Sequence, residues 1–175
     1  GQARLRKISK AQRRLQFLVG RYLLQEALHR LFGEIAKTWK LVEHGTNKPS
    51  LVGAGAPEFS LSHSHEQVVC AIAHTQVGID IEHQCERDIH ALARYICTED
   101  EWRDFQMLDI DHHMERFYQL WVLKEATFKA LGQELATPLG FAFEGSPKLM
   151  THFEEIEHID LRLFTNVSGY FGALS

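Results

Sequence analysis

The stretch Val77-Gly-Ile-Asp-Ile-Glu82 decides the fold, because it alternates apolar and polar side chains with the two-residue period of a β-strand. Its β-branched residues point to one face of the strand, and Gly78, Asp80 and Glu82 point to the other. The two carboxylates then stand about 7 Å apart at the backbone, where like charges repel unless a cation or bases neutralise them. Hard oxygen ligands of this kind suit Mg²⁺. Taken alone, the pair is better explained as ordinary acids on a solvent-facing strand edge, so a metal site needs a second acidic element.

A second charged element lies in Trp121-Val-Leu-Lys-Glu-Ala-Thr-Phe-Lys129. The spacing around it predicts a helix over 113–131 with an apolar inner stripe, which consists of Phe117, Leu120, Trp121, Phe128 and Leu131. Glu125 and Lys129 stand four residues apart, so a surface ion pair is the simplest account of them. That pair does not explain why Lys124 and Glu125 follow directly on an apolar run. Half-buried charges need partners, and a complex of metal and phosphate supplies them.

The rest of the chain mixes helices and strands without a regular βαβ rhythm, which favours an α+β fold. Residues 10–32 predict an amphipathic helix with the apolar positions Leu15, Leu18, Val19, Tyr22, Leu23, Ala27 and Leu31. Thr98 followed by Glu101 is a capping-box signature, so a helix is expected to begin near Glu99. Gly132 is placed to end the helix over 113–131.

The strands are expected in pairs. Two strands that flank a turn are predicted at Phe59–Ser62 and Val68–Ala73. The segment 45–57 is rich in Gly and Pro, which predicts a loop. Terminal strands are expected at Ala142–Phe143, Ile159–Leu163 and Tyr170–Leu174. A length of 175 residues fits one domain or two small halves that share a core.

Composition narrows the class of protein. A net charge of −4 is too weak to indicate a nucleic-acid partner. No stretch approaches the roughly 18 apolar residues of a membrane span. Three cysteines without a CxxC pair favour a reduced, cytoplasmic protein. Residues 1–25 carry only bases among their charged residues, so they can attract phosphates or an acidic partner protein. The sequence does not open on Met, which suggests a trimmed or incomplete chain.

The motifs together resemble a known family. The stretch Val77–Glu82 and the element Trp121-x-x-Lys-Glu-Ala-x-x-Lys129 resemble the paired signature of the 4′-phosphopantetheinyl transferase superfamily, and the surfactin-synthetase-type branch in particular. Asn47-Lys48-Pro49 and Phe59-Ser-Leu-Ser-His-Ser64 resemble two further elements of that branch. Asn47 departs from the usual Gly, and Val122 stands where a small residue is common. The resemblance runs from about Lys10 to the C-terminus.

The resemblance implies a fold and a reaction. Two similar halves, 1–75 and 76–175, are expected to pack as a pseudo-dimer, each a small antiparallel sheet with a long helix. The N-terminal half is expected to be incomplete at its start, and the C-terminal half to carry the metal site. The implied enzyme is Mg²⁺-dependent. It transfers the 4′-phosphopantetheine group of coenzyme A to a serine of an acidic apo-carrier protein (acyl, peptidyl or aryl carrier) and releases 3′,5′-ADP. A monomer without membrane or nucleic-acid partners is expected.

The resemblance also assigns roles to residues. Asp80, Glu82 and Glu125 correspond to the metal-binding acids, and Glu125 is also the candidate general base. Lys129 is expected to contact phosphate and steady the developing charge. The residues expected to bind coenzyme A are Lys48, Ser62, His63, Lys129 and bases of the first helix, among which Arg13, Arg14 and Arg21 are candidates.

Three other interpretations remain open at this stage. A protein of the same fold can bind coenzyme A or a carrier protein without catalysis. A structural protein needs Glu125 and Lys129 only as an ion pair, which the ordered motifs disfavour. Histidines such as His65, His74 and His83 suggest zinc, but they lack a recognised ligand spacing with companion cysteines.

Overall fold

The computed structural model describes residues 10–44, 48–131, 140–142, 148–149, 160–164 and 168–175. In chain order its elements are α2 (Ala11–Phe32), the 3-10 helix η1 (Gly33–Thr38), β1 (Lys40–Val42), β2 (Ser50–Val52), β3 (Glu58–Ser64), β4 (Gln67–Ala73), β5 (Ile79–His83), α3 (Ile89–Ile96), α4 (Glu99–Met107), α5 (Ile110–Leu131), β6 (Phe141–Ala142), β7 (Lys148–Leu149), β8 (Arg162–Phe164) and β9 (Tyr170–Leu174). Small antiparallel sheets combine with long helices, so the predicted α+β class is confirmed.

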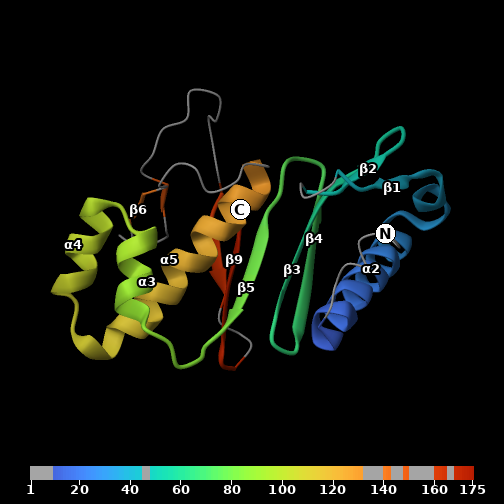
Figure 1. Ribbon diagram of the computed structural model, residues 1–175. Coiled ribbons are helices and arrows are strands. Elements are labelled where there is room, and N and C mark those ends of the chain that lie inside the picture. Colours follow the sequence, from blue (N-terminus) through green and yellow to red (C-terminus); the bar gives the residue numbers. More distant parts are fainter. Residues whose placement is uncertain (1–9, 45–47, 132–139, 143–147, 150–159, 165–167) are drawn as a thin grey trace.

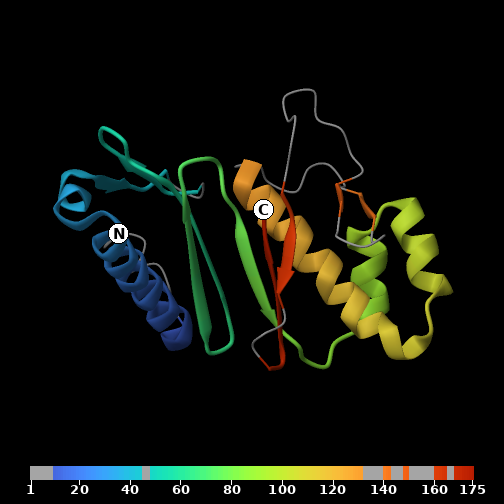
Figure 2. The same cartoon turned by 180° about the vertical axis from the view of Figure 1, so that it is seen from behind.

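Strands β3, β4, β5 and β9 lie in the middle of the molecule, whereas β1 and β2 lie toward one end (Figure 1). The hairpin β3–β4 and the sheet β5–β9–β8 are both antiparallel, and β3 lies beside β5. Helix α5 covers the β5–β9 side, α3 and α4 lie beyond α5, and α2 packs on the β3–β4 side. The view from behind shows the same order of layers (Figure 2). The stretch quoted from the sequence therefore forms the strand at which the two groups of elements meet.

The hairpin β3–β4 turns in two residues, because Ser64 pairs with Gln67. His65 in this turn has a φ of 50°, the left-handed region that a non-glycine residue adopts at some cost. Helix α2 holds the turn in place, since the side-chain amides of Gln12 and Gln16 donate to the carbonyl of His65 at 3.1 and 2.8 Å. The expected strand–turn–strand unit is confirmed, and each strand extends slightly beyond its predicted bounds.

Gly78 explains how closely β5 approaches α5. A Cβ at this position would lie 1.8 Å from the carbonyl oxygen of Ala126 and 2.5 Å from the backbone nitrogen of Ala130. Only a residue without a side chain fits there. The face that carries Gly78, Asp80 and Glu82 therefore turns toward α5, as the alternation predicted for one face of the strand.

Helix α5 forms the main core. It covers the predicted 113–131 and begins three residues earlier, at Ile110. Phe117, Leu120 and Phe128 of the predicted stripe are 0, 1 and 4% exposed. The capping box of α4 is also present, because Thr98 and Glu101 exchange backbone and side-chain hydrogen bonds. Both predictions are confirmed.

The prediction for the inner face of α2 was wrong. Leu15, Leu18, Val19, Tyr22 and Leu31 are exposed, whereas the buried residues are Gly20, Leu24 and Leu28. The helix carries apolar residues on two sides, and the hairpin packs on the side of Gly20. A Cβ added to Gly20 would meet Val68 and Leu61 at 3.6 and 3.7 Å, ordinary contact distances. Spacing alone cannot tell which of two apolar faces a neighbour will cover.

Other differences are local. The predicted loop over 45–57 contains β2, which pairs with β1, and α3 was not predicted. The terminal strand Tyr170–Leu174 is confirmed, and the strand predicted at 159–163 is described as Arg162–Phe164. Gly132 and Phe143 lie outside the described residues. Among the described helices, none has the length and apolar character that crossing a membrane requires.

Candidate functional site

Asp80 joins the two sequence motifs. The residue is 3% exposed, and its Oδ1 accepts from Lys129 Nζ of α5 at 2.5 Å and from Ser62 Oγ of β3 at 2.6 Å. Lys129 Nζ also donates to Ser62 Oγ at 3.0 Å. Three elements thus converge on one carboxylate oxygen. The simple account of Lys129, an ion pair with Glu125 along the helix, is wrong, because Lys129 pairs with Asp80.

The charge of Asp80 affects the pKa of both Glu82 and Glu125. Burial raises the pKa of Glu82, and Asp80 adds to this rise, whereas the hydrogen bond from Ser64 opposes it. Burial likewise raises the pKa of Glu125, with a further rise from Asp80 and a counter-effect from Lys129. The three predicted acids are therefore close enough to disfavour one another's ionised form.

The donor set fits a hard divalent cation by chemistry. Asp80 Oδ2 is buried and has no hydrogen-bond partner among the described residues, which is costly for a carboxylate oxygen unless a ligand completes it. Carboxylates that repel one another suit Mg²⁺, which uses few protein ligands and keeps water and phosphate in its shell. Within the described part of the chain, no three His, Cys, Asp or Glu side chains gather closely enough to hold a metal by themselves. Substrate oxygens would have to supply the remaining ligands.

A pocket of about 740 Å³ opens beside Glu82. It lies between the start of α2, the β3–β4 turn and the end of β5, and among its lining residues are Lys10, Arg13, His63, Ser64, Glu82 and Arg87. Several bases and histidines face the cavity together with one carboxylate, so a polyanion such as a phosphate ester has suitable partners there.

His63, which the resemblance expects to contact coenzyme A, lines this pocket. Partial shielding from water and the nearby charge of Arg13 lower the pKa of His63, which favours its neutral ring. Arg87 faces the same pocket and was not singled out from the sequence. It donates to Cys85 Sγ from Nη2 at 2.9 Å and stacks over Tyr118 at 5.4 Å. No motif marks Arg87, because its position depends on the chain that leaves β5.

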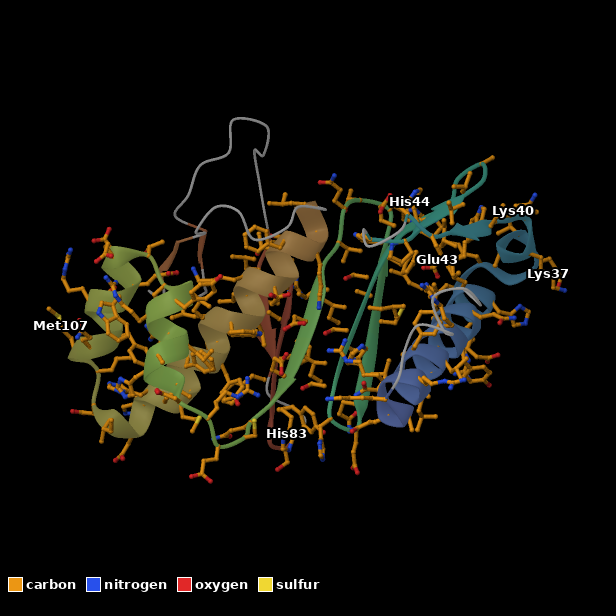
Figure 3. All side chains as sticks on the ribbon, viewed as in Figure 1. Lys37, Lys40, Glu43, His44, His83 and Met107 are labelled. Atoms are coloured by element: carbon orange, nitrogen blue, oxygen red, sulfur yellow. The ribbon has the colours of Figure 1, made fainter. Side chains whose placement is uncertain are left out.

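Five of the predicted ligands of coenzyme A do not line this pocket, and two of them, Ser62 and Lys129, contact Asp80 instead. The other three are bases. Arg14 is exposed on α2, and Arg21 forms an ion pair with Glu43 at 2.7 Å. Figure 3 shows Glu43 near the β1–β2 hairpin and His83 at the opposite end of the strands. Lys48 donates to the carbonyl of Val77 at 3.0 Å, just before β5 begins, about 20 Å along the strand from its pocket end. The roles of these three bases remain predictions.

Lys124 has a partner other than phosphate. It is 2% exposed, and its Nζ donates to both oxygens of Glu101 at 3.1 and 2.8 Å. The expectation that a metal–phosphate complex would satisfy this charge was wrong. Glu101 also accepts from the backbone N–H of Thr98 at 2.7 Å, so one carboxylate caps α4 and fixes α4 to α5. Sequence reasoning had found Glu101 only as a cap.

Sequence reasoning also missed the roles of Ser60 and Ser64. Ser64 Oγ donates to Glu82 at 2.9 Å and accepts from the backbone N–H of His83 at 3.0 Å. Ser60 Oγ accepts from the backbone N–H of Ile79 at 3.1 Å. The signal available in the sequence was the alternation of serine along β3.

Comparison with known proteins agrees with this geometry. Residues 76–165 match the family described as the 4′-phosphopantetheinyl transferase superfamily. The 4′-phosphopantetheinyl transferase gsp of Aneurinibacillus migulanus is 40% identical over 81 residues, 46% of this chain and 34% of that protein. The 4′-phosphopantetheinyl transferase Sfp of Bacillus subtilis (strain 168) is 28% identical over 122 residues, 70% of this chain and 54% of that protein.

A third relative is the 4′-phosphopantetheinyl transferase HetI of Nostoc sp., which is 30% identical over 130 residues. That match covers 71% of this chain and 55% of the relative. The chain thus spans between about a third and about half the length of these three curated relatives. The family match alone covers both the Asp80 strand and helix α5.

Proposed function

Because the chain belongs to the 4′-phosphopantetheinyl transferase superfamily, we propose that it moves the phosphopantetheine arm of coenzyme A onto a serine hydroxyl of an apo-carrier protein and releases 3′,5′-ADP. The observation that carries the proposal is the contact of Asp80 with Lys129 and Ser62. It unites residues from three separate motifs at one point, beside a pocket lined by bases.

Coenzyme A is assigned to the pocket at the end of β5. Its phosphates carry several negative charges, and Lys10, Arg13 and Arg87 line the cavity with His63. A phosphate near His63 would offset the charge of Arg13, which lowers the pKa of this ring in the free protein. The pyrophosphate would then extend toward Glu82 and Asp80.

Asp80, Glu82 and Glu125 are the residues assigned to hold Mg²⁺. When bound, the metal would reduce the charge of the pyrophosphate and stabilise charge on the departing 3′,5′-ADP. Asp80 Oδ2, which finds no hydrogen-bond partner in the described part of the chain, supports this assignment, and so do the raised pKa values of Glu82 and Glu125.

Glu125 is assigned the proton transfer. The serine oxygen of the carrier forms a bond to the phosphorus of the phosphopantetheine arm while the bond from that phosphorus to 3′,5′-ADP breaks, and the serine proton passes to the Glu125 carboxylate. A pKa raised by burial makes this carboxylate a stronger base than an exposed one. Lys129, held by Asp80, is assigned to the phosphate oxygens, where its charge favours the transition state.

The carrier is assigned an acidic surface, and it would be an acyl, peptidyl or aryl carrier. Lys10, Arg13 and Arg14 are exposed at the start of α2 and are suited to attract it. The three cysteines are free thiols, which supports a cytoplasmic location. A monomer is proposed from the family resemblance.

We also propose that the full fold is a pseudo-dimer of two similar halves, 1–75 and 76–175. The support is an analogy of packing: α2 packs on the antiparallel strands β3 and β4, and α5 packs on the antiparallel strands β5 and β9 (Figure 1).

Mass spectrometry of a carrier protein tests the activity. The full chain is incubated with coenzyme A, Mg²⁺ and an apo-acyl or apo-peptidyl carrier, and the carrier is expected to gain one phosphopantetheinyl group. Asp80→Asn and Glu125→Gln are expected to slow the transfer by at least about a hundredfold, the scale on which a positioned acid–base group contributes. Glu115→Gln is the matched control, since Glu115 is an exposed acid on the same helix.

Two results would count against the proposal. If no carrier gains mass while calorimetry shows coenzyme A binding, the chain is a non-catalytic binding module of this fold. If Asp80→Asn and Glu125→Gln transfer as fast as the unmodified chain, the assignment of the acids is wrong.

A further inference from the structure

Strand β5 hydrogen-bonds through its backbone to one neighbour only, among the residues that the structure describes. Gly78 exchanges both backbone hydrogen bonds with Ser175, and the antiparallel pairing continues along β9 through Ala173 and Phe171. The period of two in this ladder sends the N–H groups of Gly78, Asp80 and Glu82 toward β9. The N–H groups between them, on Ile79, Ile81 and His83, point to the opposite edge, where β3 lies.

Serine hydroxyls of β3 accept hydrogen bonds from these backbone N–H groups of β5. The N–H groups of Ile79, Ile81 and His83 donate to the Oγ atoms of Ser60, Ser62 and Ser64 at 3.1, 3.4 and 3.0 Å. Residue numbers rise together on both strands, so β3 and β5 run parallel. We call these three contacts the serine ladder. It takes the place of a backbone ladder between two strands that belong to different sheets and lie side by side in both views (Figures 1 and 2).

Two rungs of the serine ladder also hold a carboxylate. Ser62 Oγ donates to Asp80 at 2.6 Å, and Ser64 Oγ donates to Glu82 at 2.9 Å. Each of these two serines donates to the carboxylate of the residue eighteen positions later and accepts from the backbone amide of the residue nineteen positions later. For Ser60 the corresponding position is Gly78, which has no side chain. Ser60 therefore forms a contact of the serine ladder that holds no carboxylate, and it can be compared with Ser62 and Ser64.

We propose that the serine ladder fixes both the distance between β3 and β5 and the rotamers of the metal-site acids, with Ser64 as the positioning residue of Glu82. A hydroxyl that accepts a backbone amide cannot rotate freely, so its proton is directed at the carboxylate. Groups behind metal-binding residues commonly change affinity when removed, because they orient the ligand. The part of the inference that concerns metal rests on the proposed function, whereas the ladder itself does not.

Amide hydrogen exchange tests the ladder without any ligand. In the full chain, Ser60→Ala is expected to speed exchange at the Ile79 amide and Ser64→Ala at the His83 amide. The expected factor is roughly fivefold in each case, the effect of one lost hydrogen bond. Each change should stay at its own rung. Unchanged rates at both amides would overturn the serine ladder.

Manganese binding tests the positioning role. Mn²⁺ is titrated into the full chain and into the Ser64→Ala, Ser64→Thr and Ser60→Ala variants, and bound ion is followed by electron paramagnetic resonance. Ser64→Ala is expected to weaken binding about tenfold, Ser64→Thr to restore it through its hydroxyl, and Ser60→Ala to leave it unchanged. The melting temperature should drop by roughly 2–4 °C in Ser60→Ala, which loses one backbone contact, and by at least as much in Ser64→Ala, which also loses the hydrogen bond to Glu82.

The outcomes separate the two ideas. If the unmodified chain binds Mn²⁺ and Ser64→Ala binds it equally well, the positioning role is wrong and the proposed function stands. If the unmodified chain binds no Mn²⁺, the metal assignment in the proposed function fails and takes the positioning role with it. The exchange rates still decide the serine ladder in that case.

Discussion

Replacing Lys124 by Met probes whether this lysine holds the fold together. The Lys124 side chain is 2% exposed and its partner Glu101 5% exposed, and their closest N–O distance is 2.8 Å. Methionine nearly matches the length of lysine and leaves little cavity, so the change chiefly removes the ammonium. The Glu101 carboxylate then stays buried and loses the Lys124 ammonium.

The size of the effect follows from that burial. Removing one partner of a buried ion pair costs about 3–5 kcal/mol, because the remaining charge keeps its desolvation penalty. In a chain of this length each kcal/mol lowers the melting temperature by roughly 2–4 °C. Lys124→Met is therefore expected to melt roughly 6–20 °C below the unmodified chain.

Circular dichroism at pH 7 measures this drop, together with a double-mutant cycle. Glu101→Gln can still accept from Thr98 through its amide oxygen, so the double variant Lys124→Met/Glu101→Gln keeps the cap and buries no isolated charge. It is expected to be more stable than Lys124→Met alone. Arg103→Met is the control, because its pair with Asp100 is exposed and contributes little. A melting temperature of Lys124→Met equal to that of Arg103→Met would refute the reasoning.

Three further predictions follow from the structure. Gly78→Ala should prevent β5 from packing on α5, because the new Cβ would lie 1.8 Å from a backbone oxygen. The free energy of unfolding, measured in urea, is expected to fall by more than about 3 kcal/mol, or the variant is expected not to fold. Cys85 should be alkylated by iodoacetamide before the other two cysteines, because hydrogen bonds from Arg87 lower the pKa of the Cys85 thiol. Burial raises the pKa of Cys70 to about 11 and that of Cys97 to about 12. Mass mapping at pH 7 checks the order of alkylation, and Arg87→Met should slow the reaction of Cys85. Glu125→Gln should stabilise the protein near neutral pH, since burial raises the pKa of Glu125 above its ordinary 4.5 and its ionisation opposes folding; the gain should vanish as the pH falls below 4.5, and a constant difference across pH would contradict it.

The family resemblance drawn from the motifs is confirmed by the match over residues 76–165. The motifs sufficed because they consist of contiguous residues whose spacing is set locally. The alternation of Val77–Glu82 indicated the strand and the common face of Asp80 and Glu82, and the capping box indicated the start of α4. These elements depend on periods of two and 3.6 residues and on one cap, which a chain displays before it folds.

Contacts between distant segments could not be read in the same way. The simplest account of Lys129 was an ion pair with Glu125, four residues away, but Lys129 pairs with Asp80, 49 residues away. Lys124 pairs with Glu101, and the face of α2 that the apolar spacing predicted to be buried is exposed. In each case several partners of suitable chemistry existed along the chain. Packing chose among them.

The sequence by itself determined β5 and α5, the identity of the acids and the order of the motifs. The tertiary structure decided which side chains meet, and it decided this through two close approaches. Gly78 lets β5 touch the backbone of α5, which brings Lys129 to Asp80. The serines of β3 lie against the edge of β5 that faces away from β9, which brings Ser64 to Glu82. Both approaches depend on the distance between elements far apart in sequence, and a one-dimensional pattern carries no measure of that distance.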